Sequence, residues 1–223
     1  MNAKLFLQAL IKFFSGLVII SALLFIPAWT LLYWQAWLLI AILFIPMFAA
    51  GIVMMIKNPS LLKKRLNAKE EQSEQKTVVA LSGVMFAAAF VSAGLNFRFG
   101  WIVLPDAVTY ISAVIFLIAY VLYAEVMREN EYLSRTIEVQ ENQTVIDTGM
   151  YGIVRHPMYF TTVLIFLSMP LVLGSVISFA VMLFYFPIII KRILNEEEVL
   201  EKGLSGYSEY KKKVKYRLIP FIW

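Results

Sequence analysis

The sequence contains no cysteine and a single histidine, His156, among its 223 residues. The missing cysteines exclude disulfide bonds, thiolate metal sites and a cysteine nucleophile, and they leave the redox compartment undetermined. One histidine argues against a metal centre built on several imidazoles, so no metal site is expected. The sequence also lacks a G-x-G-x-x-G motif and a P-loop, which argues against a soluble nucleotide-binding domain.

Charged residues are scarce. They make up 16% of the chain, whereas 61% is hydrophobic and the mean hydropathy is +0.75. Soluble domains are only about 45–50% apolar, so lipid is the expected solvent for much of this surface. The net charge of +5 is interpreted as basic residues on the cytoplasmic side of a membrane protein, and no nucleic-acid partner is expected.

Long uncharged runs predict the membrane spans. Residues 13–56 carry no charged side chain, which is about twice the roughly 20 residues that cross a bilayer. This run predicts a helical hairpin that turns near Tyr33-Trp34-Gln35. It is too long for a signal-peptide core of about 7–15 residues and is interpreted as a retained anchor. Two further spans are predicted over about 77–97 and 107–124.

The polar segments between these runs predict the topology. In the charged loop 57–76, "NPSLLKKRL" predicts a short interfacial helix that begins at Pro59. If both termini, this loop and segment 125–156 are cytoplasmic, 19 of the 20 Lys and Arg residues lie on that side, and only Arg98 lies outside. This positive-inside pattern predicts a multi-pass protein with cytoplasmic termini.

The last apolar block, residues 157–190, is long for one untilted span and short for two. "MPLVLGS" places Pro170 and Gly174 in its middle, which favours a tight hairpin of two short helices, with one long tilted helix as the alternative. The predicted fold is an all-α integral membrane protein with five to six transmembrane helices: a hairpin, two further spans and a second hairpin. Residues 1–124 would hold the first helices, and 125–223 a catalytic region with a cytoplasmic tail.

Two clusters in the last third of the chain contain residues that could take part in catalysis or ligand binding. "YGIVRHPMY" places His156 beside Arg155 at a membrane boundary, with Pro157 suited to the first turn of a helix. In "KRILNEEEVL", Arg192 and Glu196 are four residues apart and share a helix face. If 157–190 is a hairpin, the second cluster returns close to the first. The simpler interpretations are an interfacial histidine and a solvated ion pair.

Two features flank these clusters. "EVQENQTVIDTG", residues 138–149, alternates apolar and polar positions and predicts a short extended segment at the membrane surface. The glycines at its end, Gly149 and Gly152, allow close approach of the backbone to another group. Near the carboxy terminus, Lys211–Lys213 predict a patch for anionic lipids.

The ordered set "TGMYGIVRHPMY", "RILNEEEVL" and "GYSEYKKKVKYRLIP" resembles the carboxy-terminal half of the isoprenylcysteine carboxyl methyltransferase family, and phospholipid N-methyltransferases share the broader pattern. The resemblance covers roughly residues 138–220. It implies a methyltransferase that uses S-adenosylmethionine in a cytoplasm-facing pocket. It also implies carboxyl O-methylation of an isoprenylcysteine-like or other lipid-like substrate, with membrane lipids as further partners.

The resemblance also implies roles for individual residues. Cofactor contacts fall on Gln140, Gln143, Thr144, Val145, Ile146, Tyr151, His156, Pro157, Met158, Tyr159 and Glu196. The implied catalytic set is Arg192, Glu196 and Glu197, with Arg192 facing the substrate carboxylate, which it could pair with bidentately. An ionised carboxylate acceptor needs no base, whereas for an amine acceptor Glu197 or His156 would be the candidate base.

Two other functions remain open. NADPH-dependent sterol and steroid reductases resemble the same carboxy-terminal pattern, including R-H-P-x-Y and a late Y-x-x-Y. They often continue with Gly-Glu after the tyrosine, whereas Tyr159 is followed here by Phe160-Thr161-Thr162, and the "EEEVL" run fits the methyltransferases better. The second alternative is a non-enzymatic membrane protein that binds a ligand.

Overall fold

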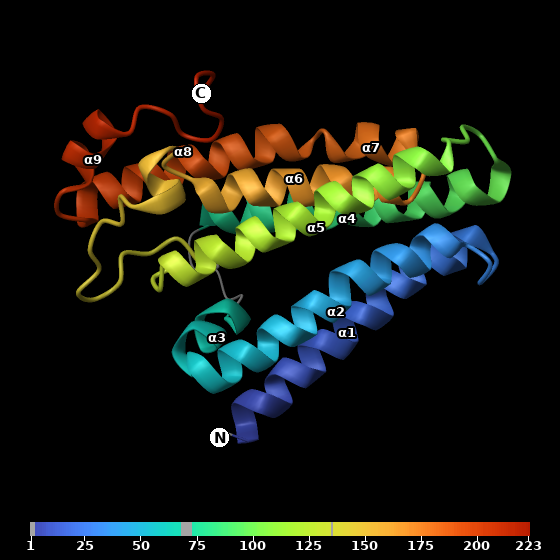
Figure 1. Ribbon diagram of the computed structural model, residues 1–223, viewed down its shortest axis with the longest axis horizontal. Coiled ribbons are helices and arrows are strands. Elements are labelled where there is room, and N and C mark those ends of the chain that lie inside the picture. Colours follow the sequence, from blue (N-terminus) through green and yellow to red (C-terminus); the bar gives the residue numbers. More distant parts are fainter. Residues whose placement is uncertain (1–2, 68–72, 135) are drawn as a thin grey trace.

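The computed structural model describes residues 3–67, 73–134 and 136–223, which fold into helices joined by loops (Figure 1). The helices are α1 (Ala3–Ala28), α2 (Trp34–Lys57), α3 (Pro59–Leu66), α4 (Ser73–Phe99), α5 (Asp106–Glu129), α6 (Pro157–Val172), α7 (Val176–Met182), α8 (Tyr185–Gly203) and α9 (Tyr207–Lys213), with a short 3-10 turn η1 (Gly149–Gly152) before α6. No strand occurs in these described ranges, and the all-α prediction is confirmed.

Within the part of the chain that the structure describes, five stretches are long and apolar enough to cross a membrane. Four of them lie in α1, α2, α4 and α5, and the fifth runs through α7 and α8, over Val176–Gly203. Helix α6, Pro157–Val172, is apolar but shorter. These helices confirm the predicted membrane class and the number of spans, because a bilayer needs about 20 apolar residues per helix.

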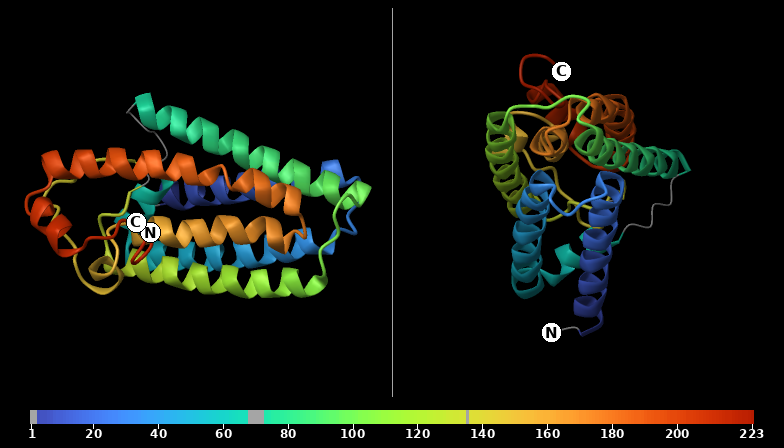
Figure 2. Two further views of the ribbon diagram at one scale, coloured as in Figure 1. Left: turned by 90° about the horizontal axis from the view of Figure 1, so that it is seen from above. Right: turned by 90° about the vertical axis from the view of Figure 1, so that its right-hand side faces the viewer.

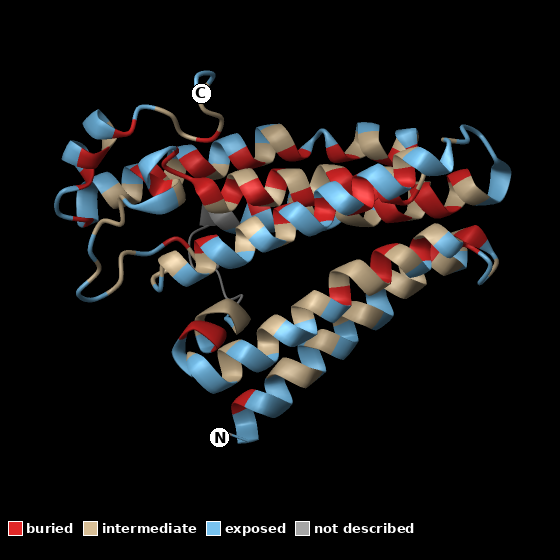
Figure 3. Ribbon diagram, in the orientation of Figure 1, coloured by how far each residue is buried: buried red, intermediate tan, exposed pale blue. Residues whose placement is uncertain are grey.

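The helices form two parts that run between the same two ends of the molecule. Helices α1 and α2 make an antiparallel hairpin that lies at an angle to the layer of α4 to α8 (Figures 1 and 2). Helix α5 packs along α6, α1 packs along α4, and α2 lies against both α5 and α6. Buried positions concentrate where α4 to α8 face one another, whereas much of the outer surface is exposed and apolar (Figure 3). Such a surface suits lipid as the surrounding solvent.

The two ends differ in chemistry. One end holds the short loops 29–33, 100–105 and 173–175 (Figure 1). There the Tyr33 hydroxyl donates to the Leu173 carbonyl at 2.6 Å and joins two of these loops. The opposite end holds α3, segment 130–156, α9 and both chain ends. We call it the charged end because it carries the basic segments of α3, α8 and α9. That this end faces the cytoplasm stays a prediction.

The second hairpin is confirmed. Helix α6 ends at Val172, and the chain reverses at Gly174, whose φ of +70° is a conformation that favours glycine. The Ser175 side chain then caps α7 by accepting from the Ser178 amide at 3.2 Å. The alternative of one long tilted helix over residues 157–190 is wrong. The reversal brings α8 back to the charged end.

The other predicted boundaries need small adjustments. The first hairpin turns over residues 29–33 and α2 begins at Trp34. The short helix predicted after residue 57 is α3, which begins at Pro59, and the Asn58 side chain accepts from the Leu61 amide at 3.0 Å to cap it. The Lys12 ammonium donates to the Leu66 carbonyl and ties α3 to α1. Part of the predicted loop 57–76, residues 68–72, lies outside the described residues.

Gly94 sets the crossing of α1 and α4. A Cβ atom at this position would lie 2.6 Å from the Leu24 carbonyl oxygen. We expect Gly94→Ala to destabilise the protein by about 1–3 kcal/mol, because the backbone of α1 must shift. Gly83→Ala, on the same helix with no atom within 4 Å, is the control and should not lower the melting temperature in detergent. Equal melting temperatures for the two variants would contradict the close crossing.

Candidate functional site

A pocket lies at the charged end, where segment 130–146, the start of α6 and the second half of α8 meet. Ten of the residues predicted for the site line it: Gln143, Thr144, Val145, Ile146, Tyr151, His156, Met158, Tyr159, Arg192 and Glu196. The hairpin over 157–190 brings these two distant parts of the sequence together.

Three predicted residues do not line the pocket. Gln140 supports the loop beneath it, because its side-chain amide donates to the Tyr132 carbonyl at 2.5 Å and its main-chain N–H donates to the Gln143 side chain at 2.9 Å. Pro157 is buried in the first turn of α6. Glu197 is buried on the other side of α8, against the carboxy-terminal tail.

Thr144, Val145 and Ile146 line the pocket and lie outside regular secondary structure. No hydrogen bond joins their amides and carbonyls to another main-chain or side-chain group of the described residues. Main-chain groups are obligatory donors and acceptors, so such a segment is suited to bind a planar polar ligand. Residues 138–149 form no strand, and a turn at Glu141 and Asn142 divides the segment that the sequence predicted to be extended.

Tyr151 is fixed from two sides. The Asn130 side chain, at the end of α5, donates to its hydroxyl at 2.9 Å, and the Tyr210 hydroxyl of α9 donates to its carbonyl at 2.7 Å. Burial raises the pKa of both Tyr151 and Tyr210, so both phenols keep their protons at neutral pH. Asn130 and Tyr210 also line the pocket. Neither residue is among those that the sequence predicted for the site, although Tyr210 belongs to the Y-x-x-Y motif.

The close approach predicted at Gly149 is made with Glu129. The Glu129 carboxylate, at the end of α5, accepts from the Thr148 hydroxyl at 3.0 Å and from the Met150 amide at 3.3 Å. A Cβ atom on Gly149 would lie 2.1 Å from this carboxylate, and φ is +48°. Glu129 therefore holds η1 in place, which in turn places Tyr151.

We expect Gly149→Ala to lower stability by about 2–3 kcal/mol, because a positive φ costs about 1 kcal/mol and the carboxylate must also move. Gly100→Ala is the matched control, since Gly100 has φ +62° but no atom within 4 Å. The two melting temperatures in detergent, compared with the unmodified protein, separate backbone strain from the clash. An equal loss in both variants would show that the Glu129 contact contributes nothing.

Arg192, Tyr159 and Glu196 form one hydrogen-bonded chain. The Arg192 guanidinium donates from Nε to the Tyr159 hydroxyl at 3.0 Å, and this hydroxyl donates to the Glu196 carboxylate. Arg192 and Glu196 lie one turn apart on α8, as their spacing predicted. The tyrosine thus holds a cation and an anion at fixed places in the pocket wall.

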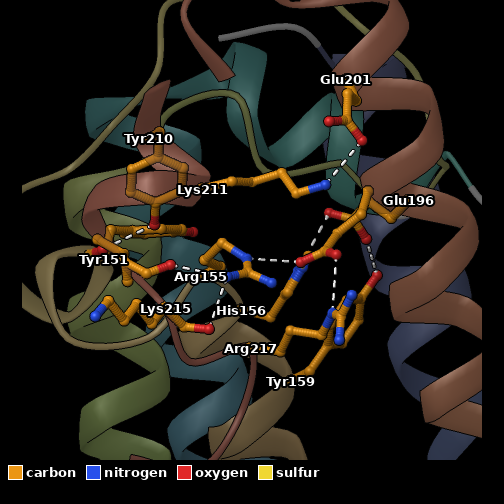
Figure 4. Close-up of polar contacts among 12 residues, drawn as sticks. Tyr151, Arg155, His156, Tyr159, Glu196, Glu201, Tyr210, Lys211, Lys215 and Arg217 are labelled. Atoms are coloured by element: carbon orange, nitrogen blue, oxygen red, sulfur yellow. Dashed lines mark hydrogen bonds and ion pairs between the residues drawn. The ribbon is translucent and has the colours of Figure 1, made fainter. Parts of the chain in front are cut away.

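Behind the pocket lies a buried cluster centred on Glu197. Its Oε1 accepts from Arg155 Nε at 2.7 Å, and its Oε2 accepts from Arg217 Nε at 2.9 Å. Figure 4 shows Arg155, His156 and Arg217 gathered around this point. The side chains of Arg155 and Glu197 are only 5% and 4% exposed, so this ion pair is shielded from water.

The carboxy-terminal tail completes the cluster. Arg155 Nη1 donates to the carbonyls of Val214 and Lys215 at 2.8 and 2.9 Å. In the same region, the amides of Arg155 and His156 donate to the carbonyls of Tyr216 and Arg217, each at 2.9 Å. These bonds fix the tail behind the R-H-P motif, a role of Arg155 that the sequence did not indicate.

The predicted anionic-lipid patch is partly engaged within the protein. Lys211 pairs with Glu201 at 2.8 Å and Lys213 pairs with Asp147 at 2.6 Å. The hydrogen bond from Lys213 lowers the pKa of Asp147. Two of the three clustered lysines therefore hold α9 to its neighbours.

Helix α3 reaches the pocket rim, which no sequence signal had indicated. Arg65 Nη1 lies 3.7 Å from the sulfur of Met158, a pocket residue, and its guanidinium lies 5.5 Å from the centre of the Tyr123 ring. Lys64 donates to the Glu131 carbonyl at 3.3 Å. The amino-terminal hairpin thus contributes cations beside the pocket.

Comparison with known proteins gives a family match and a similarity to a curated relative. Residues 107–205, somewhat less than half of the chain, match the family described as phospholipid methyltransferase. A curated relative is Delta(14)-sterol reductase TM7SF2 of Mus musculus, which is 29% identical over 91 residues. This match covers 40% of the chain, and the chain spans only 22% of the length of the relative. The family match covers every pocket residue except Tyr210 and confirms the relationship inferred from the motifs.

Proposed function

Because residues 107–205 match the phospholipid methyltransferase family, we propose that this chain is an integral membrane methyltransferase that uses S-adenosylmethionine. The observation that carries the proposal is the pocket at the charged end. It joins ten residues that the methyltransferase motifs had assigned to cofactor and substrate. We also propose that this end faces the cytoplasm, because basic residues concentrate there.

The pocket residues fit the chemistry of the cofactor. When bound, S-adenosylmethionine supplies an electrophilic methyl group on a positively charged sulfur. The Glu196 carboxylate would hold its cationic groups, and Thr144–Ile146 would bind its base. The rings of Tyr151 and Tyr159 line the same space and would pack against the adenine or the sulfonium.

Arg192 is the proposed substrate residue. It lines the pocket, and its guanidinium is held by Tyr159. A guanidinium is suited to orient a carboxylate, and orientation is most of what in-line methyl transfer needs. We therefore propose carboxyl O-methylation of an isoprenylcysteine-like or other lipid-like acceptor that enters from the bilayer. An ionised carboxylate needs no base in this reaction.

Glu197 receives a different role from the one its motif implied. Its carboxylate is buried and accepts from Arg155 and Arg217, so it is not placed to touch a ligand in the pocket. We propose that it positions the R-H-P motif. Glu196 and Arg192 keep their proposed contacts with cofactor and substrate.

The reductase alternative is favoured by one observation, the match to the mouse Delta(14)-sterol reductase. Both functions would use a pocket at this place, so ligand binding separates them. The proposal is tested by calorimetric titration of the purified protein in detergent with S-adenosylhomocysteine and, separately, with NADPH. Saturable binding of the first alone is expected.

Binding of NADPH alone would overturn the methyltransferase proposal in favour of a reductase. Binding of neither ligand by protein with a cooperative melting transition, in detergent supplemented with lipid, would favour the non-enzymatic alternative. The Glu198→Ala variant is the control for both titrations, since Glu198 is exposed and pairs with Lys202 away from the pocket.

A further inference from the structure

The single histidine of the chain lies between two carboxylates, one that lines the pocket and one that is buried behind it. His156 Nε2 lies 3.3 Å from Glu197 Oε1, within hydrogen-bond reach, whereas Nδ1 lies 4.0 Å from Glu196 Oε1, which is beyond it. The histidine side chain is 4% exposed. Its two nitrogens therefore face different groups, one in the buried cluster and one on the side of the pocket residue Glu196.

The ring has little freedom to turn. The His156 amide donates to the Arg217 carbonyl at 2.9 Å, and the residue precedes the first turn of α6. The imidazole stacks near the Tyr159 ring, with 5.7 Å between the ring centres and 27° between the planes. The ring is thus held by the tail, by α6 and by α8 together.

Glu197 decides which nitrogen carries the proton. Its two oxygens already accept from Arg155 and Arg217, and an ionised carboxylate can only accept hydrogen bonds. The histidine nitrogen that faces it must therefore be the N–H donor. In a neutral imidazole the other nitrogen is then an acceptor.

The charged side chains around the ring are two carboxylates and three guanidiniums. Glu196 and Glu197 of α8 supply two negative charges, and Arg155 and Arg217 supply two positive charges. Arg192 adds a further positive charge through Tyr159.

We propose that Glu197 is a positioning residue that fixes His156 in the Nε2–H tautomer and so presents Nδ1 to the pocket as a hydrogen-bond acceptor. The pocket then offers an uncharged acceptor beside the Glu196 carboxylate. Such a pair suits a ligand group with an N–H or O–H donor, such as an ammonium or a hydroxyl. The ligand contact rests on the proposed function, whereas the tautomer does not.

The experiment is ¹⁵N NMR of the purified protein in detergent with ¹⁵N-labelled histidine, in which His156 gives the only imidazole signals. We expect one protonated Nε2 and one unprotonated Nδ1 at neutral pH. A protonated Nδ1, whether alone or together with Nε2, would overturn the proposal. This measurement on the unmodified protein needs no variant to fold.

Two variants test the part of Glu197. Glu197→Gln places an amide, which can donate or accept, next to Nε2, and we expect the single tautomer to give way to a mixture. Glu198→Gln is the matched control, because Glu198 is exposed on the next position of α8, and it should leave the spectrum unchanged. An unchanged spectrum in folded Glu197→Gln would overturn the positioning role.

Addition of S-adenosylhomocysteine tests the ligand contact. The Nδ1 signal is expected to shift on saturation. Calorimetric binding without any change at Nδ1 would overturn the contact and leave the methyltransferase proposal standing. Absence of calorimetric binding would instead count against the proposed function, while the tautomer of the free protein is still decided by its own spectrum.

Discussion

Replacement of Glu196 by alanine is expected to weaken S-adenosylhomocysteine binding about 100-fold, below calorimetric detection. A lost contact to a charged group costs about 1.5–3 kcal/mol, and 1.4 kcal/mol corresponds to tenfold in affinity. Glu196 also accepts the hydrogen bond of Tyr159, so its removal frees a second residue of the pocket wall. Both effects act on the cofactor side of the site.

Arg192→Ala is the comparison variant, and we expect it to impair turnover rather than cofactor binding. We expect its affinity for S-adenosylhomocysteine to stay within about threefold of the unmodified protein. Methyl transfer to a lipid-like carboxylate should fall by about 10²–10³-fold, since the variant lacks the group that orients the acceptor and stabilises developing charge. The assay is transfer of labelled methyl groups to extracted lipid.

The assigned roles require that the two variants differ in their affinity for S-adenosylhomocysteine. Equal loss of cofactor binding in Glu196→Ala and Arg192→Ala would contradict them, because Arg192 would then belong to the cofactor side. Glu198→Ala controls for a general effect of changing α8, since its carboxylate pairs with Lys202 at the surface. It should retain both binding and turnover.

The membrane helices could be predicted because they depend on local properties. The length of an uncharged run determines how many times it can cross a bilayer, and the run over 13–56 is long enough for two crossings, which makes a hairpin. Gly174 predicted the second reversal for the same reason, since its backbone conformation is open mainly to glycine. That reversal then brought Arg192 and Glu196 to the R-H-P motif.

The sequence could not predict which side of α8 each carboxylate of the site faces. Glu196 and Glu197 are neighbours in the sequence, but successive residues of a helix point about 100° apart. Glu196 therefore lines the pocket while Glu197 faces the tail. Only the packed position of α8 decides which carboxylate has which role. The contact of Arg65 with Met158 depends in the same way on how the two parts of the molecule meet.

The second large effect is expected from Arg155→Leu. The change removes the guanidinium that donates to Glu197 and to the carbonyls of Val214 and Lys215. Breaking a buried ion pair by removing one partner costs about 3–5 kcal/mol, because the remaining charge is left in a poorly hydrated place. We expect the melting temperature in detergent to fall by about 10 °C. The tail after residue 213 should also become accessible to protease.

The control is Arg128→Leu, which removes an arginine that pairs with Glu125 at 2.6 Å, with side chains 75% and 47% exposed. Both are Arg–Glu pairs, but this one is exposed and lies within one helix, so this variant should melt close to the unmodified protein. Equal melting temperatures for the two variants would contradict the structural role of the buried cluster. If instead only Arg155→Leu loses stability and also loses the single tautomer of His156, then the tail, the cluster and the pocket nitrogen act as one unit. A short carboxy-terminal tail would in that case control the chemistry that the pocket presents.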